Sequence, residues 1–213
     1  MNIVPVSEYW DQILQSRDEA YLGLIYRVPP RLWRPLKTVQ DELRSADSAH
    51  LFAQPSTFHV TVKGLGYVER TMDNLRYEKA MKKIGEIISD FRPFTVNIKG
   101  LGYFPTSVFA RVEDPTNQFL MINKRISEEL EGEVERSEYD ADAYIPHVTL
   151  ATFNSKDADQ MLRKLATPEL REYEFGQCSV FEIEAVEVNL LLALGPEETQ
   201  DSAFSYVRSF YLG

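Results

Sequence analysis

The chain of 213 residues is 44% hydrophobic and 12% aromatic, which is enough to form a sizeable core without disulfides or metals and argues against a disordered or collagen-like chain. Its formal net charge of −10 disfavours binding to long duplex nucleic acid and to anionic membranes, because that binding comes mainly from lysine and arginine. The single cysteine permits no internal disulfide, and no signal peptide or membrane-spanning run is recognisable. We therefore expect a reduced, cytoplasmic, monomeric protein.

Strands and helices alternate along the chain, and no Pro/Gly/Ser-rich linker divides it. Apolar residues at helical spacing predict helices over 6–17, 31–45, 73–89, 115–131 and 155–166, the last with Ser155 as its N-cap. Alternating or continuous apolar runs predict strands over 21–28, 57–63, 95–100, 107–113, 144–153, 180–194 and 204–212. This order indicates a single domain over residues 1–213, of the α/β or α+β class.

The pentapeptide KGLGY occurs twice, at 63–67 and at 99–103, each time close to the end of a predicted strand. Pairs of glycines suit tight turns, so we expect a turn at both places. Neither copy is a dinucleotide-binding fingerprint, because the third glycine and the following helix are missing.

Two of the three histidines stand in the same local frame, as HVTV at 59–62 and as HVTL at 147–150. In a strand, residues i and i+2 lie on one face, so each motif presents an imidazole beside a hydroxyl while the apolar residues pack behind them. His59 and Thr61 would face His147 and Thr149 across a cleft. A lone strand histidine is commonly structural, but a matched pair favours chemistry.

Two imidazoles and two hydroxyls are suited to phosphoester chemistry without a metal or a cofactor. With an unperturbed pKa near 6.5, one imidazole can accept a proton while the other, protonated, donates one. The hydroxyls of Thr61 and Thr149 can donate to the non-bridging phosphate oxygens, where negative charge accumulates. We predict that His59 and His147 are the catalytic pair.

Several neighbours are candidates for substrate contacts. Lys63 follows on the face of His59 and could meet a phosphate, or it could lie at the strand end in water. Tyr144, and Tyr103 or Phe104 in a nearby turn, could stack on a base or ribose, although core packing is the commoner role for each.

The acidic run of Glu138, Asp140 and Asp142 precedes His147 and could suggest a metal site. Two strand histidines and such a loop do not form a closed ligand set, so we expect a solvated loop and no metal. His50 has no threonine two residues later and is not assigned to the site.

The paired tetrads resemble the HxTx signatures of the two-histidine (2H) phosphoesterase superfamily, which includes RNA 2'-5' ligase-like proteins and cyclic nucleotide phosphodiesterases. YLGLIYRVPPRL also resembles its opening strand and helix, and GLGYFP followed by VFARVE resembles its glycine-phenylalanine-proline turn and next strand. The resemblance implies a bilobal α+β fold with pseudo-two-fold symmetry, in which helices flank two antiparallel-dominated sheets and each lobe gives one HxTx to a central cleft. Residues 1–19 would then be an added N-terminal helix.

The resemblance further implies metal-independent opening or cleavage of a phosphodiester in a nucleotide or a short RNA, often a cyclic phosphate. Two alternatives remain open from the sequence. One is RNA end processing or 2'-5' ligation on the same scaffold, and the other is a protein that binds a nucleotide or RNA end without turning it over.

Overall fold

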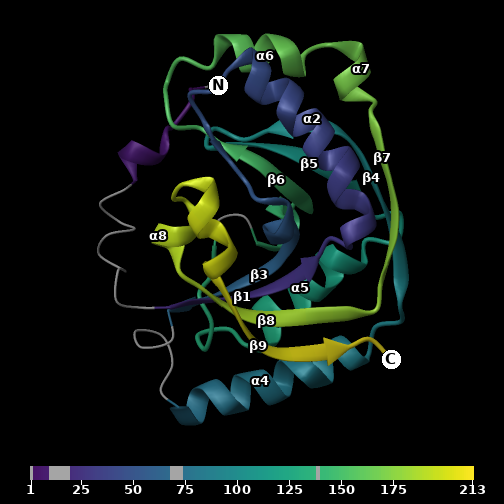
Figure 1. Ribbon diagram of the computed structural model, residues 1–213. Coiled ribbons are helices and arrows are strands. Elements are labelled where there is room, and N and C mark those ends of the chain that lie inside the picture. Colours follow the sequence, from purple (N-terminus) through teal and green to yellow (C-terminus); the bar gives the residue numbers. More distant parts are fainter. Residues whose placement is uncertain (1, 10–19, 68–73, 138–139) are drawn as a thin grey trace.

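The computed structural model describes residues 2–9, 20–67, 74–137 and 140–213 (Figure 1). The predicted helix over 6–17 lies mostly outside these residues, and its described part is a 3-10 turn, η1 (Val6–Glu8). No helix within the described residues is long and apolar enough to cross a membrane.

The strands form one antiparallel sheet with the order β7-β4-β5-β6-β3-β1-β8-β9, to which the short β2 is added through β6. Their bounds are β1 (Tyr21–Arg27), β2 (Leu51–Phe52), β3 (His59–Tyr67), β4 (Phe94–Tyr103), β5 (Ser107–Glu113), β6 (His147–Thr152), β7 (Glu174–Val180), β8 (Glu182–Val188) and β9 (Phe204–Tyr211).

The sheet consists of two halves that meet at its centre. One half ends at β6 and the other at β3, and these two strands are joined through a single residue pair, Val60 with Val148. In each half the connection between the inner strand and the strand beside it contains a helix: α2 lies between β1 and β3, with the short β2 following it, and α5 lies between β5 and β6. The expected α+β class with antiparallel strands is confirmed, and the two expected sheets are continuous through that pair.

Helices cover the apolar face of the sheet and flank its ends (Figure 1). Val60 and Val148 are fully buried on that face, where α2 contacts β6 and α5 contacts β3. Helix α4 lies along β9, and α7 lies against β4. The helices are α2 (Trp33–Ala46), α4 (Asn74–Ser89), α5 (Gln118–Glu129), α6 (Asp159–Leu165), α7 (Pro168–Arg171) and α8 (Leu190–Ala193). The side chains of His59 and His147 lie on the opposite face at the centre of the sheet, which these helices do not cover.

Three local expectations are wrong. Helix α6 begins at Asp159, and the Ser155 hydroxyl accepts a hydrogen bond from the Asp157 amide instead of capping the helix. The strand expected to reach residue 194 ends at Val188, and α8 follows it. Both KGLGY segments continue β3 and β4 instead of turning. In the second, Gly100 has φ 68°, and a Cβ there would lie 2.1 Å from the Arg171 carbonyl oxygen, so glycine is needed for close approach.

The remaining elements are short 3-10 turns and strands that the sequence patterns did not predict. Strand β7 lies at one edge of the sheet and was missed, because its alternation is interrupted by Gly176. The turns are η2 (Pro30–Leu32), η3 (Pro55–Thr57), η4 (Ala141–Ala143) and η5 (Glu197–Ser202).

Candidate active site

The two HxTx segments lie side by side at the centre of the sheet. Because β3 and β6 are antiparallel and Val60 pairs with Val148, His59 lies opposite Thr149 and Thr61 opposite His147. Directly opposed residues share a face, so all four side chains point away from the face that α2 and α5 cover. The predicted meeting of the two motifs therefore follows from the register of the one residue pair that joins the two halves.

Both imidazoles are held in the same way. His59 Nδ1 lies 2.7 Å from the Thr57 carbonyl oxygen, and His147 Nδ1 lies 2.7 Å from the Ile145 carbonyl oxygen. A carbonyl only accepts, so each Nδ1 must donate a proton, and each Nε2 is left to exchange protons with a ligand. His59 Nε2 also lies 3.2 Å from the Thr61 hydroxyl. The two halves thus present matched Nε2 atoms.

Aromatic rings fix the orientation of both imidazoles. Phe204, at the start of β9, meets His59 edge to face with ring centroids 5.1 Å apart. Phe104 and Phe109 meet His147 at 5.0 and 5.1 Å. Such contacts restrict the rotation of each ring, and they leave Nε2 as the polar edge.

The surroundings favour neutral imidazoles. Burial lowers the pKa of His59 to about 4, although its hydrogen bond with the Thr57 carbonyl acts in the opposite direction. Repulsion from the positive charges of His147 and Arg27 lowers that pKa further. Burial also lowers the pKa of His147, against the effect of the Ile145 carbonyl. At neutral pH both rings are therefore mostly uncharged, and a bound anion would be needed to stabilise a proton on one of them.

Two cavities open beside the histidines. The His59 cavity, of about 260 Å³, is lined by His59 and Thr149, and the His147 cavity, of about 380 Å³, is lined by His147 and Thr61. Thr106, in the turn between β4 and β5, and Ser107, the first residue of β5, line both cavities. The cavities are therefore neighbouring parts of one cleft, and the four HxTx side chains stand where they adjoin.

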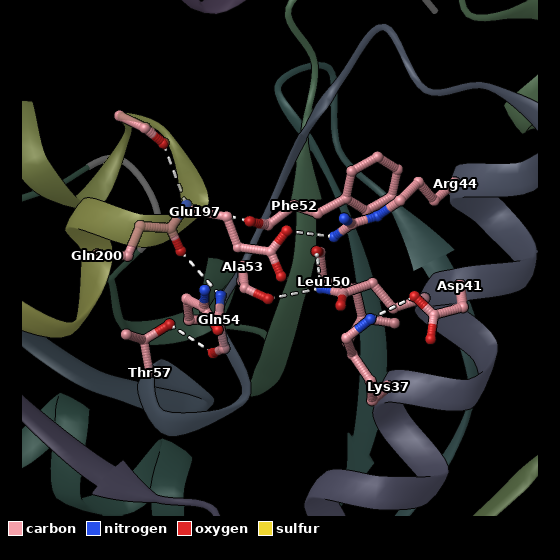
Figure 2. Close-up of polar contacts among 12 residues, drawn as sticks. Lys37, Asp41, Arg44, Phe52, Ala53, Gln54, Thr57, Leu150, Glu197 and Gln200 are labelled. Carbon is pink, nitrogen blue, oxygen red and sulfur yellow. Dashed lines mark hydrogen bonds and ion pairs between the residues drawn. The ribbon is translucent and has the colours of Figure 1, made fainter.

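Buried and partly buried polar contacts join the wall of the His59 cavity to the rest of the fold (Figure 2). The Gln200 amide donates to the carbonyl oxygen of Phe52 at 3.1 Å and accepts from the Gln54 amide at 2.8 Å. An ion pair of 2.6 Å between Arg44 and Glu197 joins the same segment to α2. These contacts hold the connection between β8 and β9 against the segment that precedes His59.

Of the predicted aromatic contacts, the structure brings Tyr144 and Phe104 to the cleft. Both line the His147 cavity, and the Tyr144 hydroxyl donates to the Thr61 carbonyl oxygen at 2.9 Å. Burial raises the pKa of Tyr144, so its hydroxyl stays protonated. Tyr103 is 40% exposed and lines neither cavity, so the structure does not place it at the site.

Lys63 lines the His147 cavity, but its ammonium is engaged by other protein groups. Its side chain is fully buried, and Nζ lies 2.5 Å from Asp140 Oδ2 and 2.7 Å from the Glu135 carbonyl oxygen. Asp140 also accepts hydrogen bonds from the Asn123 side chain and from the Ser137 amide. The alternative that Lys63 lies at the strand end in water is therefore wrong, and its ammonium is neutralised by the buried Asp140 carboxylate.

The acidic segment before His147 is likewise only partly solvated. The side chain of Asp142 is 96% exposed, as expected, whereas that of Asp140 is only 7% exposed. Glu138 lies outside the described residues. Within the part of the chain that the structure describes, no three His, Cys, Asp or Glu side chains are grouped so that they could hold a metal ion.

His50 lines neither the His59 cavity nor the His147 cavity. It is 5% exposed, lies 3.2 Å from Asp47 Oδ2, and accepts a hydrogen bond from the Asn154 amide. Its position supports leaving it out of the site.

Comparison with known proteins identifies the family. The model of the 2'-5' RNA ligase superfamily matches residues 27–188. The chain belongs to this superfamily. A curated relative from Methanothermobacter thermautotrophicus, named RNA 2',3'-cyclic phosphodiesterase, is 29% identical over 175 residues that cover 78% of this chain and 88% of the relative. A relative of the same name from Aquifex aeolicus is 26% identical and covers 76% and 81%.

Solved structures share the fold of this superfamily member. Escherichia coli LigT complexed with 3'-AMP superposes with a TM-score of 0.68 at 13% identity, over 91% of this chain and 98% of LigT. TT0787 of Thermus thermophilus superposes with a TM-score of 0.62 at 20% identity, over 90% and 97%. The prediction of a 2H-type phosphodiesterase is confirmed at the level of the family and the fold.

Proposed function

We propose that this protein is a metal-independent phosphodiesterase that opens a cyclic phosphate on a nucleotide or at the end of a short RNA, by general acid and base catalysis from His59 and His147. The observation that carries the proposal is the matched presentation of the two Nε2 atoms beside two threonine hydroxyls, at the junction of two cavities. The names of the two curated relatives support the choice of a 2',3'-cyclic phosphate.

In the reaction, one imidazole accepts a proton at Nε2 from a water molecule as the water oxygen attacks phosphorus. The bond from phosphorus to one ribose oxygen breaks, and the other imidazole donates its Nε2 proton to that oxygen. The products are a phosphomonoester and a free sugar hydroxyl. Thr61 and Thr149 donate hydrogen bonds to the non-bridging oxygens, where charge increases in the transition state.

The lowered pKa values of both histidines are consistent with a pair in which one imidazole becomes protonated when the anionic substrate binds. A phosphodiester brings one negative charge next to the two Nε2 atoms, and this charge raises the pKa of whichever imidazole it contacts. The protonated acid is then favoured only when a substrate is present. No cofactor has a part in this scheme.

The test is a substrate panel in EDTA with identification of the products. It contains 2',3'-cyclic nucleotides, linear 2'-5' and 3'-5' dinucleotides, and cyclic oligonucleotides. We expect the 2',3'-cyclic phosphates to be opened to one monoester isomer at an undiminished rate in EDTA. Loss of turnover in EDTA that a divalent ion restores would refute the metal-independent mechanism, and failure to open any of these compounds would refute the function.

A further inference from the structure

Both HxTx motifs end in the same irregularity of their strand. In β3 the residues on either side of Val62 pair with consecutive residues of β1, so Val62 has no partner there. In β6 the residues on either side of Leu150 pair with consecutive residues of β5, so Leu150 is unpaired in the same way. Each unpaired residue is the fourth of its motif and directly follows the threonine, Thr61 or Thr149. Both motifs therefore carry a β-bulge at the same place.

The bulges give the two strands the same pattern of burial. In each motif the second and fourth residues are buried, and so is the residue that follows the motif, whereas a regular strand would bury only alternate residues. A bulge next to an active site can re-aim a neighbouring side chain. The threonine before each bulge is the last residue that follows the alternation starting at the histidine. Whatever fixes the bulge therefore fixes the end of the segment that presents the imidazole and the hydroxyl to the cleft.

A buried glutamine of α2 binds the bulge of β6. Gln40 is fully buried, and its Nε2 donates to the Leu150 carbonyl oxygen at 2.8 Å and to the Ala53 carbonyl oxygen at 2.7 Å. The Ala53 amide donates to the same Leu150 oxygen at 3.0 Å (Figure 2). Within the described residues, Gln40 Oε1 has no hydrogen-bond partner. A buried acceptor without a partner costs free energy, so the contribution of this side chain is its two donated hydrogen bonds.

A buried asparagine of α5 binds the bulge of β3. Asn123 is 1% exposed, and its Nδ2 donates to the Val62 carbonyl oxygen at 2.9 Å. Nδ2 also donates to Asp140 Oδ1 at 3.1 Å, and Oδ1 of Asn123 accepts from the Ala141 amide at 2.9 Å. Ala141 has φ 52°, a left-handed conformation that is unfavourable for alanine. Asn123 thus holds the bulge of β3 and the start of η4 together.

The two amide side chains connect the halves of the sheet crosswise. Helix α2 lies between β1 and β3, but Gln40 binds the bulge of β6. Helix α5 lies between β5 and β6, but Asn123 binds the bulge of β3. The two halves of the sheet itself are joined only through the pair of Val60 and Val148. Each motif is therefore fixed by a side chain from the other half, so the two threonines are also fixed relative to each other.

We infer that Gln40 and Asn123 are positioning residues of the active site, which fix the directions of Thr149 and Thr61 through the bulges that follow them. This inference rests on the proposed function, since it assumes that both hydroxyls donate to the phosphate. A donor that is displaced by about 1 Å from a transition-state oxygen can lower the rate by about 10²-fold. Gln40 lines neither cavity, so it acts on the reaction only through the strand.

The test is a pair of double-variant cycles on the opening of a 2',3'-cyclic nucleotide. Gln40→Met keeps the length of the side chain, removes both donors and leaves no unpartnered acceptor. Alone it should lower kcat by roughly 10- to 10²-fold and leave KM within about threefold of the wild type. In the Thr149→Val background it should lower kcat by less than about twofold more, because the hydroxyl that it positions is absent. In the Thr61→Val background it should keep its full effect.

Two controls separate positioning from a loss of stability. Gln118→Met makes the same change at a glutamine of α5 whose Oε1 also has no partner within the described residues and which lines neither cavity. Leu43→Ala removes a fully buried side chain of α2 and keeps the hydrogen bonds at the bulge. Both should leave kcat within about twofold of the wild type, although Leu43→Ala destabilises the fold. A wild-type kcat in Gln40→Met, or equal losses in the two threonine backgrounds, would overturn the inference.

Asn123→Leu is the second variant, in which the threonines exchange roles. It should lower kcat less in the Thr61→Val background than in the Thr149→Val background. The two backgrounds are compared because Asn123 also lines the His147 cavity and binds Asp140, so part of its loss does not pass through Thr61. Equal losses, or the opposite order, would overturn its assignment to Thr61.

Amide hydrogen exchange tests the contacts at the bulges without any turnover. Gln40→Met should speed exchange of the Ala53 amide by roughly 2- to 10-fold and leave the Ala141 amide unchanged, and Asn123→Leu should do the reverse. Faster exchange of both amides in both variants would indicate general destabilisation and would overturn the separate roles. If exchange behaves as expected but no cyclic nucleotide is opened, the proposed function fails and the contacts at the bulges stand. Turnover without coupling specific to one threonine refutes only the positioning roles.

Discussion

Replacement of Lys63 separates a structural role of this lysine from a phosphate-binding role. Lys63→Met keeps the length of the side chain but removes the ammonium from Asp140, whose carboxylate stays only 7% exposed. The Glu135 carbonyl oxygen, 2.7 Å from Nζ, loses its donor as well. The carboxylate keeps two donors, the Asn123 side chain at 3.1 Å and the Ser137 amide at 2.7 Å.

Breaking one side of a buried ion pair costs about 3–5 kcal/mol, because the remaining charge is left desolvated. The two remaining donors to Asp140 place Lys63→Met near the lower value, at about 3 kcal/mol. Asp140→Asn should lose a similar amount. The double variant Lys63→Met/Asp140→Asn should lose less than the sum of the two by at least about 1–2 kcal/mol, since the partners are in direct contact.

The assay is urea unfolding at pH 7, with kcat/KM for a 2',3'-cyclic nucleotide measured on the same samples. Lys156→Met is the matched control, because Lys156 forms an ion pair of equal length, 2.5 Å, with Glu8, but its side chain is 73% exposed. That variant should lose less than about 1 kcal/mol. If Lys63→Met unfolds like the wild type while KM rises steeply, Lys63 binds phosphate and its ion pair with Asp140 does not stabilise the fold.

Two further predictions concern the histidines. His59→Ala and His147→Ala should each lower kcat by roughly 10²–10⁴-fold, and Thr61→Val or Thr149→Val should lower it by roughly 10–10³-fold. The control His50→Ala should destabilise the fold and leave kcat within about twofold of the wild type. The catalytic assignment is refuted if His50 proves essential and the other two histidines do not. The pH profile of kcat/KM should be bell-shaped, because the active pair of imidazoles carries one proton. Activity should fall below about pH 4, where His59 is also protonated, and above the lowered pKa of His147, where both rings are neutral. The maximum should therefore lie on the acid side of pH 6.5. A profile that is flat from pH 4 to 8.5 would exclude the two-histidine mechanism.

The four HxTx residues could be predicted because strict alternation carries information on which side chains share a face. After an irregularity in the strand, alternation no longer predicts the face on which a side chain lies. The register of β3 on β1 shifts between Thr61 and Lys63, and Lys63, although it lines the His147 cavity with Thr61, is held in a buried ion pair that alternation does not predict. Its true partner, Asp140, lies 77 residues further along the chain, a distance over which spacing gives no signal.

The same limit applies to Thr152, which lines the His59 cavity. In β6 the residue Leu150 has no partner in β5, because Val108 pairs with Ala151 and Phe109 with Thr149. This bulge shifts the alternation before Thr152, and the Leu150 carbonyl oxygen accepts a hydrogen bond from Gln40, 110 residues away in the chain. Phe204 could not be assigned to His59 from the sequence either, since the contact requires that β9 be placed by Gln200 and its partners. Motifs that repeat within strands can thus be read from the sequence, whereas contacts made through bulges and long-range polar bonds require the fold.

The charges that line the two cavities limit how many negative charges a substrate can bring into the cleft. The described lining of the two cavities holds one ammonium and one carboxylate, Lys63 and Asp140, and these neutralise each other. The chain carries a net charge of −10, and among the described lining residues no unpaired cation offsets its repulsion of a polyanion. A phosphodiester brings a single negative charge, which one protonated imidazole can balance. The monoester product carries up to two negative charges. Because the described lining residues supply no second unpaired cation, the second charge of the product is not balanced, which favours its release.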